Sequence, residues 1–263
     1  MGKLQGKGAV VLGAANRDNM GQVIARRFHD EGATVVVAGR RMDELQRFAG
    51  EIGGHALPCD IADHDQVHAL AREAKARLGH VDIALNATGW GLLKPFLETT
   101  PEELDRITDI QFKGTFYFLQ AMVDAMDRGG SIIQISSATA TIMLNDHAAY
   151  MGTKAGTDHV VRCVANEFGM RGIRANSISP GLTDTPMTAE AKEVPGLFEA
   201  FRAGYPLGRW GTSDDIAAAA VWLASDECFM TGENLQVNGG LTLRRNPTRE
   251  EIAASVQAAT GAG

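Results

Sequence analysis

The sequence predicts an α/β fold: a single Rossmann-like, doubly wound parallel sheet with helices on both faces. Short β-branched runs alternate with segments of helical period, which is the pattern of successive βαβ units. A glycine-rich turn, 13–21, joins the first expected strand to the first expected helix. The 263 residues, 44% hydrophobic and 22% charged, suit one globular domain with a large core.

The first half of the chain alternates strands with helices. Each helix carries apolar residues at i, i+3 and i+4 and stops at a glycine, as at Gly32, Gly53 and Gly79. The expected strands are 8–12, 34–38, one ending before Asp60, and 81–87; the expected helices are 21–31, 45–52 and 67–78.

The second half continues this alternation and then departs from it. Thr100 to Glu103 form a capping box with proline at the first helical position, which predicts one long helix towards Met126. Strands are expected at 131–136, 173–178 and 235–237, and helices at 150–169 and 214–225. Segment 183–211 holds three prolines and scattered apolar residues, so we expect a substrate loop there.

We therefore divide the chain into a Rossmann-fold domain, 1–243, that includes this loop, and a C-terminal extension, 244–263. Thr248 and Glu251 form another capping box, and Ile252 and Val256 follow at helical spacing, which predicts a short amphipathic helix. Its apolar face could pack on its own subunit or on a neighbour, and the sequence leaves both open.

Composition narrows the function. A net charge of -7 and a pI near 5.5 argue against nucleic acid or an anionic membrane as a partner, and favour a small-molecule substrate. There is no apolar stretch typical of a secretory signal or a membrane span, so we expect a cytoplasmic enzyme. Cys59, Cys163 and Cys228 lack metal-ligand spacing, so we expect reduced core cysteines and no metal.

Tyr150, Lys154 and Ser137 form the pattern with the clearest chemistry. Lys154 comes four residues after Tyr150, so the two share a helix face. A free tyrosine has a pKa of about 10, and a neighbouring cation stabilises the phenolate that a proton-transfer base needs. Ser137 ends a strand, where its hydroxyl can donate to a carbonyl oxygen. The alternative is an ordinary amphipathic helix face.

These three residues, with the 13–21 turn, Asn86 to Gly89 and Pro180-Gly181, resemble the short-chain dehydrogenase/reductase family, of the ketoreductase or secondary-alcohol dehydrogenase type. The resemblance runs from about Ala9 to Gly240, with the motifs in the family's order. It implies an NAD(P)-dependent enzyme (EC 1.1.1.-) and, because members are commonly oligomeric, a homotetramer or homodimer.

The resemblance also implies the cofactor contacts, although the glycine turn is longer than is usual and Leu12 replaces the family's threonine. The residues expected at the cofactor are Gly13, Asn16, Arg17, Met20, Gly21, Arg40, Asp60, Ile61, Asn86, Ala87, Gly89, Tyr150, Lys154, Pro180, Gly181, Thr183 and Thr185.

The residues after the second strand bear on cofactor choice. NAD enzymes place an acid there for the ribose, whereas Gly39 is followed here by Arg40 and Arg41. We expect Arg40, and secondly Arg17, to bind the 2'-phosphate, so NADP(H) is preferred and NAD(H) is possible. The alternative is a solvated basic turn.

By the same resemblance, Tyr150 exchanges the hydroxyl proton, Ser137 holds the substrate oxygen, and Lys154 binds the nicotinamide ribose and lowers the Tyr150 pKa. The family's asparagine in the long helix, part of a proton relay, is Gln111 here, so Gln111 is a fourth catalytic candidate. Enoyl reductases of the family separate tyrosine and lysine by six residues. That spacing would need tyrosine at His147, so carbonyl chemistry is preferred.

The candidate substrate pocket is largely apolar, which favours a hydrophobic or cyclic ketone or alcohol. Its expected residues are Trp90, Thr139, Met143, Leu144, His147 and Met187, with Leu92, Leu93, Phe198, Phe201 and Trp210 as further candidates. Two other functions stay open. One is reduction of a 3-oxoacyl thioester on acyl carrier protein or CoA; the other is a catalytically silent, cofactor-binding regulatory protein.

Overall fold

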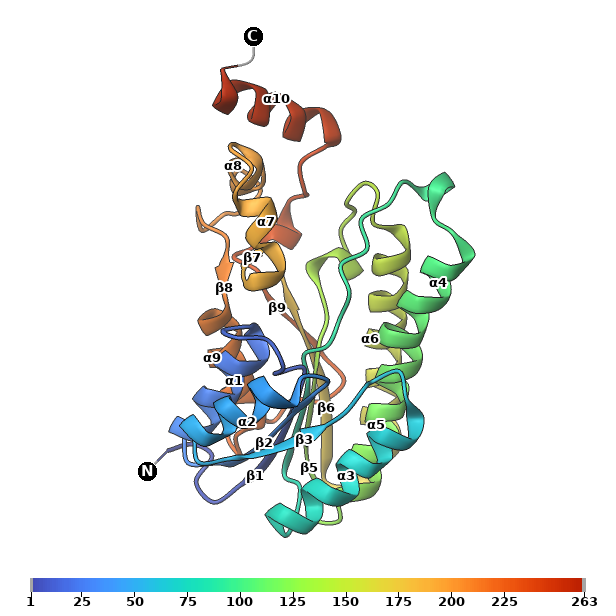
Figure 1. Cartoon of the computed structure of the whole chain (residues 1–263), viewed down its shortest axis with the longest axis vertical. Helices are drawn as coiled ribbons and strands as arrows, with labels where there is room; N and C mark the ends of the chain where they lie inside the picture. Colours follow the sequence, from blue (N-terminus) through green and yellow to red (C-terminus); the bar gives the residue numbers. More distant parts are fainter. Residues whose placement is uncertain (1, 262–263) are drawn as a thin grey trace.

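A computed structural model describes residues 2–261 and contains a seven-stranded parallel sheet in the order β3-β2-β1-β4-β5-β6-β9 (Figure 1). The strands are β1 (Gly8–Leu12), β2 (Thr34–Gly39), β3 (His55–Pro58), β4 (Ile83–Asn86), β5 (Gly130–Ile135), β6 (Ile173–Pro180) and β9 (Asn234–Val237). The predicted doubly wound fold is confirmed. Because the strand order reverses between β1 and β4, the carboxyl ends of these strands border a crevice suited to a ligand.

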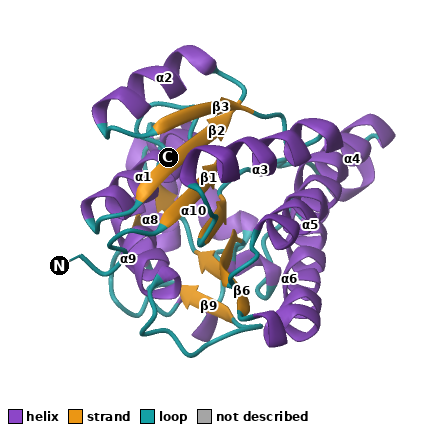
Figure 2. Ribbon diagram, turned by 90° about the horizontal axis from the view of Figure 1, so that it is seen from below, coloured by secondary structure: helices purple, strands orange, loops and turns teal. Residues whose placement is uncertain are grey.

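Helices cover both faces of the sheet (Figure 2). One layer contains α1 (Met20–Asp30), α2 (Met42–Glu51) and α9 (Ser213–Ala224), whose apolar sides share a core with alternate residues of β1, β2 and β4. The other layer contains α3 (His64–Leu78), α5 (Gly114–Ala125) and α6 (Ala148–Phe168), over the opposite side of the same strands. Side chains along each strand alternate between the two faces of the sheet, so each face packs against its own hydrophobic core.

The long helix expected from Thr100 to Met126 is not one regular helix. It consists of α4 (Pro101–Thr108), a π-helical turn (Asp109–Lys113) and α5. The capping box at Thr100 and Glu103 is present as predicted. A π turn inserts one extra residue into a helix, and this one includes Gln111. Such irregularities often occur at functional sites.

Segment 183–211 folds as short elements instead of one open loop. They are β7 (Thr183–Asp184), a 3₁₀ turn (Pro186–Thr188), α7 (Ala189–Lys192), α8 (Leu197–Arg202) and β8 (Gly211–Thr212). Other 3₁₀ turns lie at Phe96–Glu98, Ala138–Ala140, Gly169–Arg171 and Leu241–Leu243. Phe198 and Phe201 are 3% and 8% exposed. They belong to the interior of this region, which corrects their expected place in the pocket.

The predicted C-terminal helix is α10 (Arg249–Thr260), with its capping box, and it lies against α8 (Figure 1). Ser255 Oγ donates to the Gly196 carbonyl at 2.7 Å. A Cβ at Gly196, whose φ is +80°, would lie 2.3 Å from the Ser255 carbonyl oxygen, so only glycine permits this approach. Within this chain, α10 therefore packs on α8.

Two further sequence expectations concern the cysteines and membrane-spanning helices. Cys59 and Cys228 are buried as expected, and burial raises the pKa of Cys59 to about 12. Cys163 is exposed on α6, so its expected core position is wrong: it lies on the outer side of that helix. Among residues 2–261, no helix is both long and apolar enough to span a bilayer.

Candidate active site

The glycine turn leaves the carboxyl end of β1 and presses against β4. A Cβ at Gly13, where φ is +103°, would lie 2.8 Å from the Ala87 carbonyl carbon, and one at Gly21 would lie 2.5 Å from the Gly13 carbonyl oxygen. Asn19 caps α1 and also donates to the Gly13 carbonyl at 2.8 Å. The turn is thus held close to the sheet, with the N-terminus of α1 beside it.

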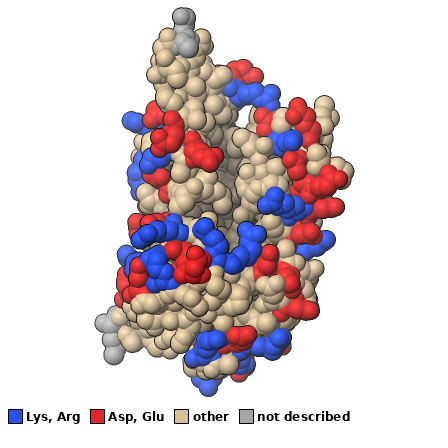
Figure 3. Space-filling view, in the orientation of Figure 1, with Lys and Arg blue, Asp and Glu red and all other residues tan. Residues whose placement is uncertain are grey.

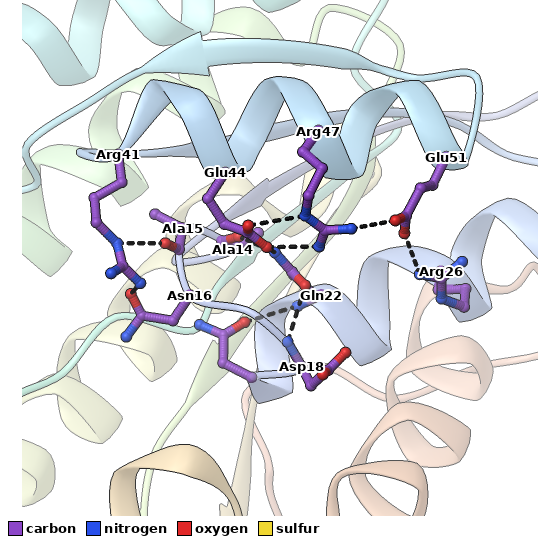
Figure 4. Close-up of polar contacts among 11 residues, drawn as sticks. Ala14, Ala15, Asn16, Asp18, Gln22, Arg26, Arg41, Glu44, Arg47 and Glu51 are labelled. Atoms are coloured by element: carbon purple, nitrogen blue, oxygen red, sulfur yellow. Dashed lines mark hydrogen bonds and ion pairs between the residues drawn. The ribbon is translucent and has the colours of Figure 1, made fainter.

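A polar network fastens the turn to α2 (Figure 4). Gln22 Nε2 donates to the Ala14 carbonyl at 3.0 Å and to Glu44 Oε1 at 2.8 Å, while Gln22 Oε1 accepts from the Asp18 amide at 3.0 Å. Hydrogen bonds from Arg47 and then Gln22 lower the pKa of Glu44 to about 2. Sequence reasoning missed Gln22 and Glu44; only the Glu44/Arg47 spacing of three gave a signal.

The two arginines after β2 differ in their contacts. Arg41 Nε donates to the Ala15 carbonyl at 2.8 Å and Arg41 also bonds to the Asn16 amide oxygen, so Arg41 holds the turn. Arg40, the predicted phosphate ligand, is exposed, as is Arg17. Figure 3 shows Lys and Arg side chains gathered beside the hollow over the start of α2. A cluster of cations suits an anion, and the phosphate contact of Arg40 stays a prediction.

Further cofactor candidates follow the carboxyl ends of β3 and β4 or begin α1. Asn86 is fully buried; its Nδ2 donates to Gln134 Oε1 at 2.9 Å, and its Oδ1 accepts from Thr88 Oγ1 at 2.7 Å. It therefore steadies β4 against β5, as the resemblance implies. Asp60 and Ile61 lie after β3, with Asp60 Oδ1 accepting from the Ala62 amide at 3.1 Å. Met20 begins α1.

Ser137, Tyr150 and Lys154 converge beside the end of β5. Lys154 is 4% exposed, and its Nζ donates to the Ile135 carbonyl at 2.8 Å and lies 5.6 Å from the Tyr150 ring centroid. Ser137 Oγ is 2.8 Å from Thr139 Oγ1. The residues therefore gather as the spacing predicted.

The pKa values show how burial acts on this group. Desolvation lowers the pKa of Lys154 to about 8, against an opposing effect of Asp158. Desolvation raises the pKa of Tyr150, and a hydrogen bond from Ser137 acts the other way. The expected lowering of the Tyr150 pKa by Lys154 is thus not found in the chain alone: burial sets the direction, and the Lys154 ammonium donates to the Ile135 carbonyl.

Gln111 lies next to Lys154. It is 3% exposed; its Nε2 donates to Thr153 Oγ1 at 2.7 Å, and its Oε1 accepts from the Trp90 amide at 3.2 Å. A Cβ at Gly89 would lie 3.2 Å from Gln111 Oε1 and 3.8 Å from Lys154 Nζ. The longer amide side chain is thus accommodated by the π turn and a neighbouring glycine.

The turn after β6 contains Pro180, Gly181, Thr183 and Thr185. Thr183 Oγ1 donates to the Gly181 carbonyl at 3.0 Å, and the Thr185 amide donates to Thr188 Oγ1 at 3.2 Å. The Leu182 amide donates to the Tyr205 hydroxyl at 2.6 Å. Tyr205, whose pKa burial raises to about 12, was missed because its role depends on a contact distant in sequence.

The pocket candidates separate into exposed and packed side chains. Met143 and Met187 are 67% and 66% exposed, and Gly91 faces the Met187 sulfur, since its Cβ would lie 3.9 Å away. His147 stacks on Tyr150 with ring centroids 4.3 Å apart, and burial lowers its pKa. The Arg106 guanidinium lies over the Trp90 ring. Of the other candidates, Leu92 is buried, Leu93 is exposed, and the half-buried ones are Trp90, Thr139, Leu144 and Trp210.

Comparison with known proteins gives a consistent result. Residues 13–242 match the family model described as "Enoyl-(Acyl carrier protein) reductase". The chain is 35% identical to D-threitol dehydrogenase of Mycolicibacterium smegmatis, covering 92% of this chain and 95% of that protein. It is 37% identical to 3beta-hydroxysteroid dehydrogenase 1 of Eggerthella lenta, covering 91% and 95%.

A solved short-chain type dehydrogenase/reductase from Mycobacterium ulcerans superposes with a TM-score of 0.90 at 30% identity, covering 98% of this chain and 96% of that one. Fold, site and matches together define an NAD(P)-dependent oxidoreductase. The chain belongs to the short-chain dehydrogenase/reductase family, of the ketoreductase type, and is an alcohol/ketone oxidoreductase.

Proposed function

We propose that this enzyme is an NADP(H)-dependent oxidoreductase that interconverts a secondary alcohol and a ketone on a hydrophobic or cyclic substrate. The observation that carries the proposal is the convergence of Ser137, Tyr150 and Lys154 beside β5. When bound, the nicotinamide would supply or accept the hydride.

The side chains then divide the remaining work of ketone reduction. Ser137 donates a hydrogen bond to the carbonyl oxygen, and Tyr150 donates the proton that the oxygen gains as the carbon receives the hydride. Lys154, whose Nζ lies 5.6 Å from the Tyr150 ring centroid, stabilises the resulting phenolate. Oxidation of the alcohol reverses each transfer.

Gln111 is proposed to support this proton transfer. Its amide connects the Trp90 backbone to Thr153, one residue before Lys154. If Gln111→Ala leaves both the rate and the pH profile unchanged, the residue is structural. Gln111→Asn is the matched variant, because it keeps the amide and shortens the side chain by one methylene.

The residues present fit a dinucleotide. The glycine turn presents Ala15, Asn16 and Arg17 beside the N-terminus of α1, where backbone amides and the helix dipole favour a pyrophosphate. Arg17 lies in the glycine turn and Arg40 lies just before α2, and both are exposed cations. These features support a 2'-phosphate contact and hence NADP(H).

Titration of the free enzyme with NADPH and NADH tests cofactor choice. We expect tighter binding of NADPH, and Arg40→Ala should weaken NADPH binding about tenfold or more while leaving NADH binding nearly unchanged. Equal affinity for both nucleotides in the unaltered enzyme would reject the preference. Arg26→Ala, on the outer side of α1 and paired with Glu51, is the control.

Exposed Met143 and Met187 support an apolar substrate. The named relatives act on a polyol and, by name, on a steroid alcohol, so both acyclic and cyclic alcohols belong in the screen. A panel of cyclic, aromatic and acyl ketones, followed by polyols, tests this proposal. Turnover confined to polyols would reject the hydrophobic class. No turnover with intact cofactor binding would favour a regulatory protein.

We also propose a cytoplasmic homo-oligomer whose first 243 residues form the catalytic domain and whose residues 244–263 extend the substrate side. Leu104 and Phe116, on α4 and α5, are 49% and 41% exposed, which supports burial against a second copy. Light scattering after size exclusion tests the oligomer; a monomer at micromolar concentration would reject it.

A further inference from the structure

Asp158 is a buried acid that the proposed chemistry does not use. It lies on α6 one turn after Lys154 and is 6% exposed. Burying a carboxylate is costly unless hydrogen bonds or a cation compensate. The surroundings of Asp158 therefore indicate why the fold keeps it.

Its contacts join three elements at the catalytic end of the sheet. Asp158 Oδ2 accepts from Ser136 Oγ at 2.8 Å and from Asn234 Nδ2, on β9, at 2.6 Å. Ser136 directly precedes Ser137, and Lys154 Nζ holds the carbonyl of Ile135, one residue earlier. Lys154 and Asp158, one turn apart on α6, thus bind Ile135 and Ser136. These two residues directly precede Ser137 at the end of β5.

The charges around this pair are few. Lys154 and Arg162 on α6 are the cations that act on Asp158, while Ser136, Ser177 and Asn234 approach it from β5, β6 and β9 as neutral groups. Ser177 Oγ and Asp158 Oδ1 are both buried and have no hydrogen-bond partner in good geometry. Burial raises the pKa of Asp158, and Ser177, Ser136 and the two cations oppose that rise.

Lys154 itself faces Tyr150, the Ile135 carbonyl and Asp158. No Lys154–Asp158 ion pair within 4.0 Å occurs among residues 2–261, so the carboxylate acts on the ammonium through space. In a buried site such an interaction is weakly screened. Desolvation alone would deprotonate Lys154 at a lower pH, and the Asp158 charge opposes it.

We propose that Asp158 is a positioning residue that joins the Ser137 end of β5 to α6 and β9 and supplies a negative charge one helical turn from the Lys154 ammonium. The inference rests on the proposed roles of Ser137, Tyr150 and Lys154. No bond is formed or broken at Asp158.

The test reads the protonation of Lys154 directly in the cofactor-free enzyme. Lysine labelled with ¹³C at Cε is titrated by NMR, and the Lys154 signal is assigned as the one missing from Lys154→Met. We expect a midpoint near 8 in the unaltered protein. Asp158→Asn keeps the side-chain shape and removes the charge, so the midpoint should fall by about one pH unit, a tenfold change in the protonation equilibrium.

Activity supplies the second readout. Asp158→Asn should move the alkaline limb of the pH-rate profile downward by the same amount as the NMR midpoint. Ser136→Ala is the matched control: it removes the hydroxyl contact and leaves the acid, so turnover should fall without a comparable shift of the Lys154 midpoint. An unchanged midpoint in Asp158→Asn would overturn the proposal.

If Asp158→Asn does not fold, the titration of Lys154 in the unaltered enzyme tests the proposal. Its Lys154 signal should show a second, smaller inflection at acidic pH, where Asp158 gains its proton; a single inflection counts against the proposal. Failure of the proposed function is distinguishable, since it would appear as absent turnover in the unaltered enzyme while the Lys154 titration stays measurable.

Discussion

The dinucleotide side and the substrate side of this molecule are built differently. On the dinucleotide side, β1, β2 and β4 are almost wholly buried, and Gly13 and Gly21 let backbone approach backbone. On the substrate side, segment 183–211 forms short elements fastened by Tyr205 and by α10, with Met187 exposed. Tight packing fixes the structure of the dinucleotide side. Substitutions on the surface of the substrate side should cost less stability.

The largest effect is expected where both sides meet. Tyr150→Phe removes the proton donor and should lower turnover by about 10²- to 10⁴-fold while cofactor affinity stays within a few-fold. Steady-state kinetics and nucleotide titration measure the two quantities. Tyr117→Phe, on α5, is the control and should retain nearly full turnover. Equal losses in both variants would contradict the assignment.

The second-largest effect is expected at the close backbone contact between Gly13 and Ala87 on the dinucleotide side. Gly13→Ala places a Cβ 2.8 Å from the Ala87 carbonyl carbon at a φ of +103°, so we expect a loss of about 2–4 kcal/mol in unfolding free energy and weaker nucleotide binding. Gly50→Ala is the control, because nothing lies within 4 Å of its Cβ, and it should stabilise α2 slightly. Chemical denaturation measures both.

The substrate side should respond more gently and more selectively. Ending the chain after Pro247 removes α10 from α8, so KM for the ketone should rise several-fold while the Kd of the nucleotide is unchanged. Arg249→Ala breaks only the surface pair with Asp146 and should leave both KM and stability nearly unchanged. Equal weakening of nucleotide binding on truncation would remove the distinction between the two sides.

The smallest effect concerns acid stability of the glycine turn. The folded pKa of Glu44, about 2, lies below its ordinary value of 4.5, so its stabilisation is present above about pH 4.5 and is lost as pH falls towards 2. Glu44→Gln should cost about 1 kcal/mol at pH 7 and little at pH 2.5. Glu73→Gln, from the exposed pair with Arg77, should be nearly neutral at both. A cost independent of pH would contradict this account.

The sequence predicted the sheet well because its signals are local. The strand at 8–12 has the predicted bounds, and the glycine turn and the capping boxes at Thr100 and Thr248 lie where short-range patterns placed them. The convergence of Ser137, Tyr150 and Lys154 also followed, since a strand end and a helix spacing of four fix it.

Other features could not be predicted in this way. The π turn at Gln111 depends on packing around Gly89 and Thr153, and the network of Gln22 with Glu44 joins two helices. Phe198 and Phe201 are buried because α10 and Leu241 cover their region. Periodicity alone does not distinguish such residues from pocket lining.

By itself, the sequence determined the fold class, the glycine turn and the spacing of the catalytic side chains, because backbone geometry converts local order directly into position. Only the tertiary structure decided the protonation balance, since the pKa values of Tyr150 and Lys154 depend on burial and on Asp158. It also decided where the C-terminal helix packs. Burial and long-range contacts are properties of the assembled chain.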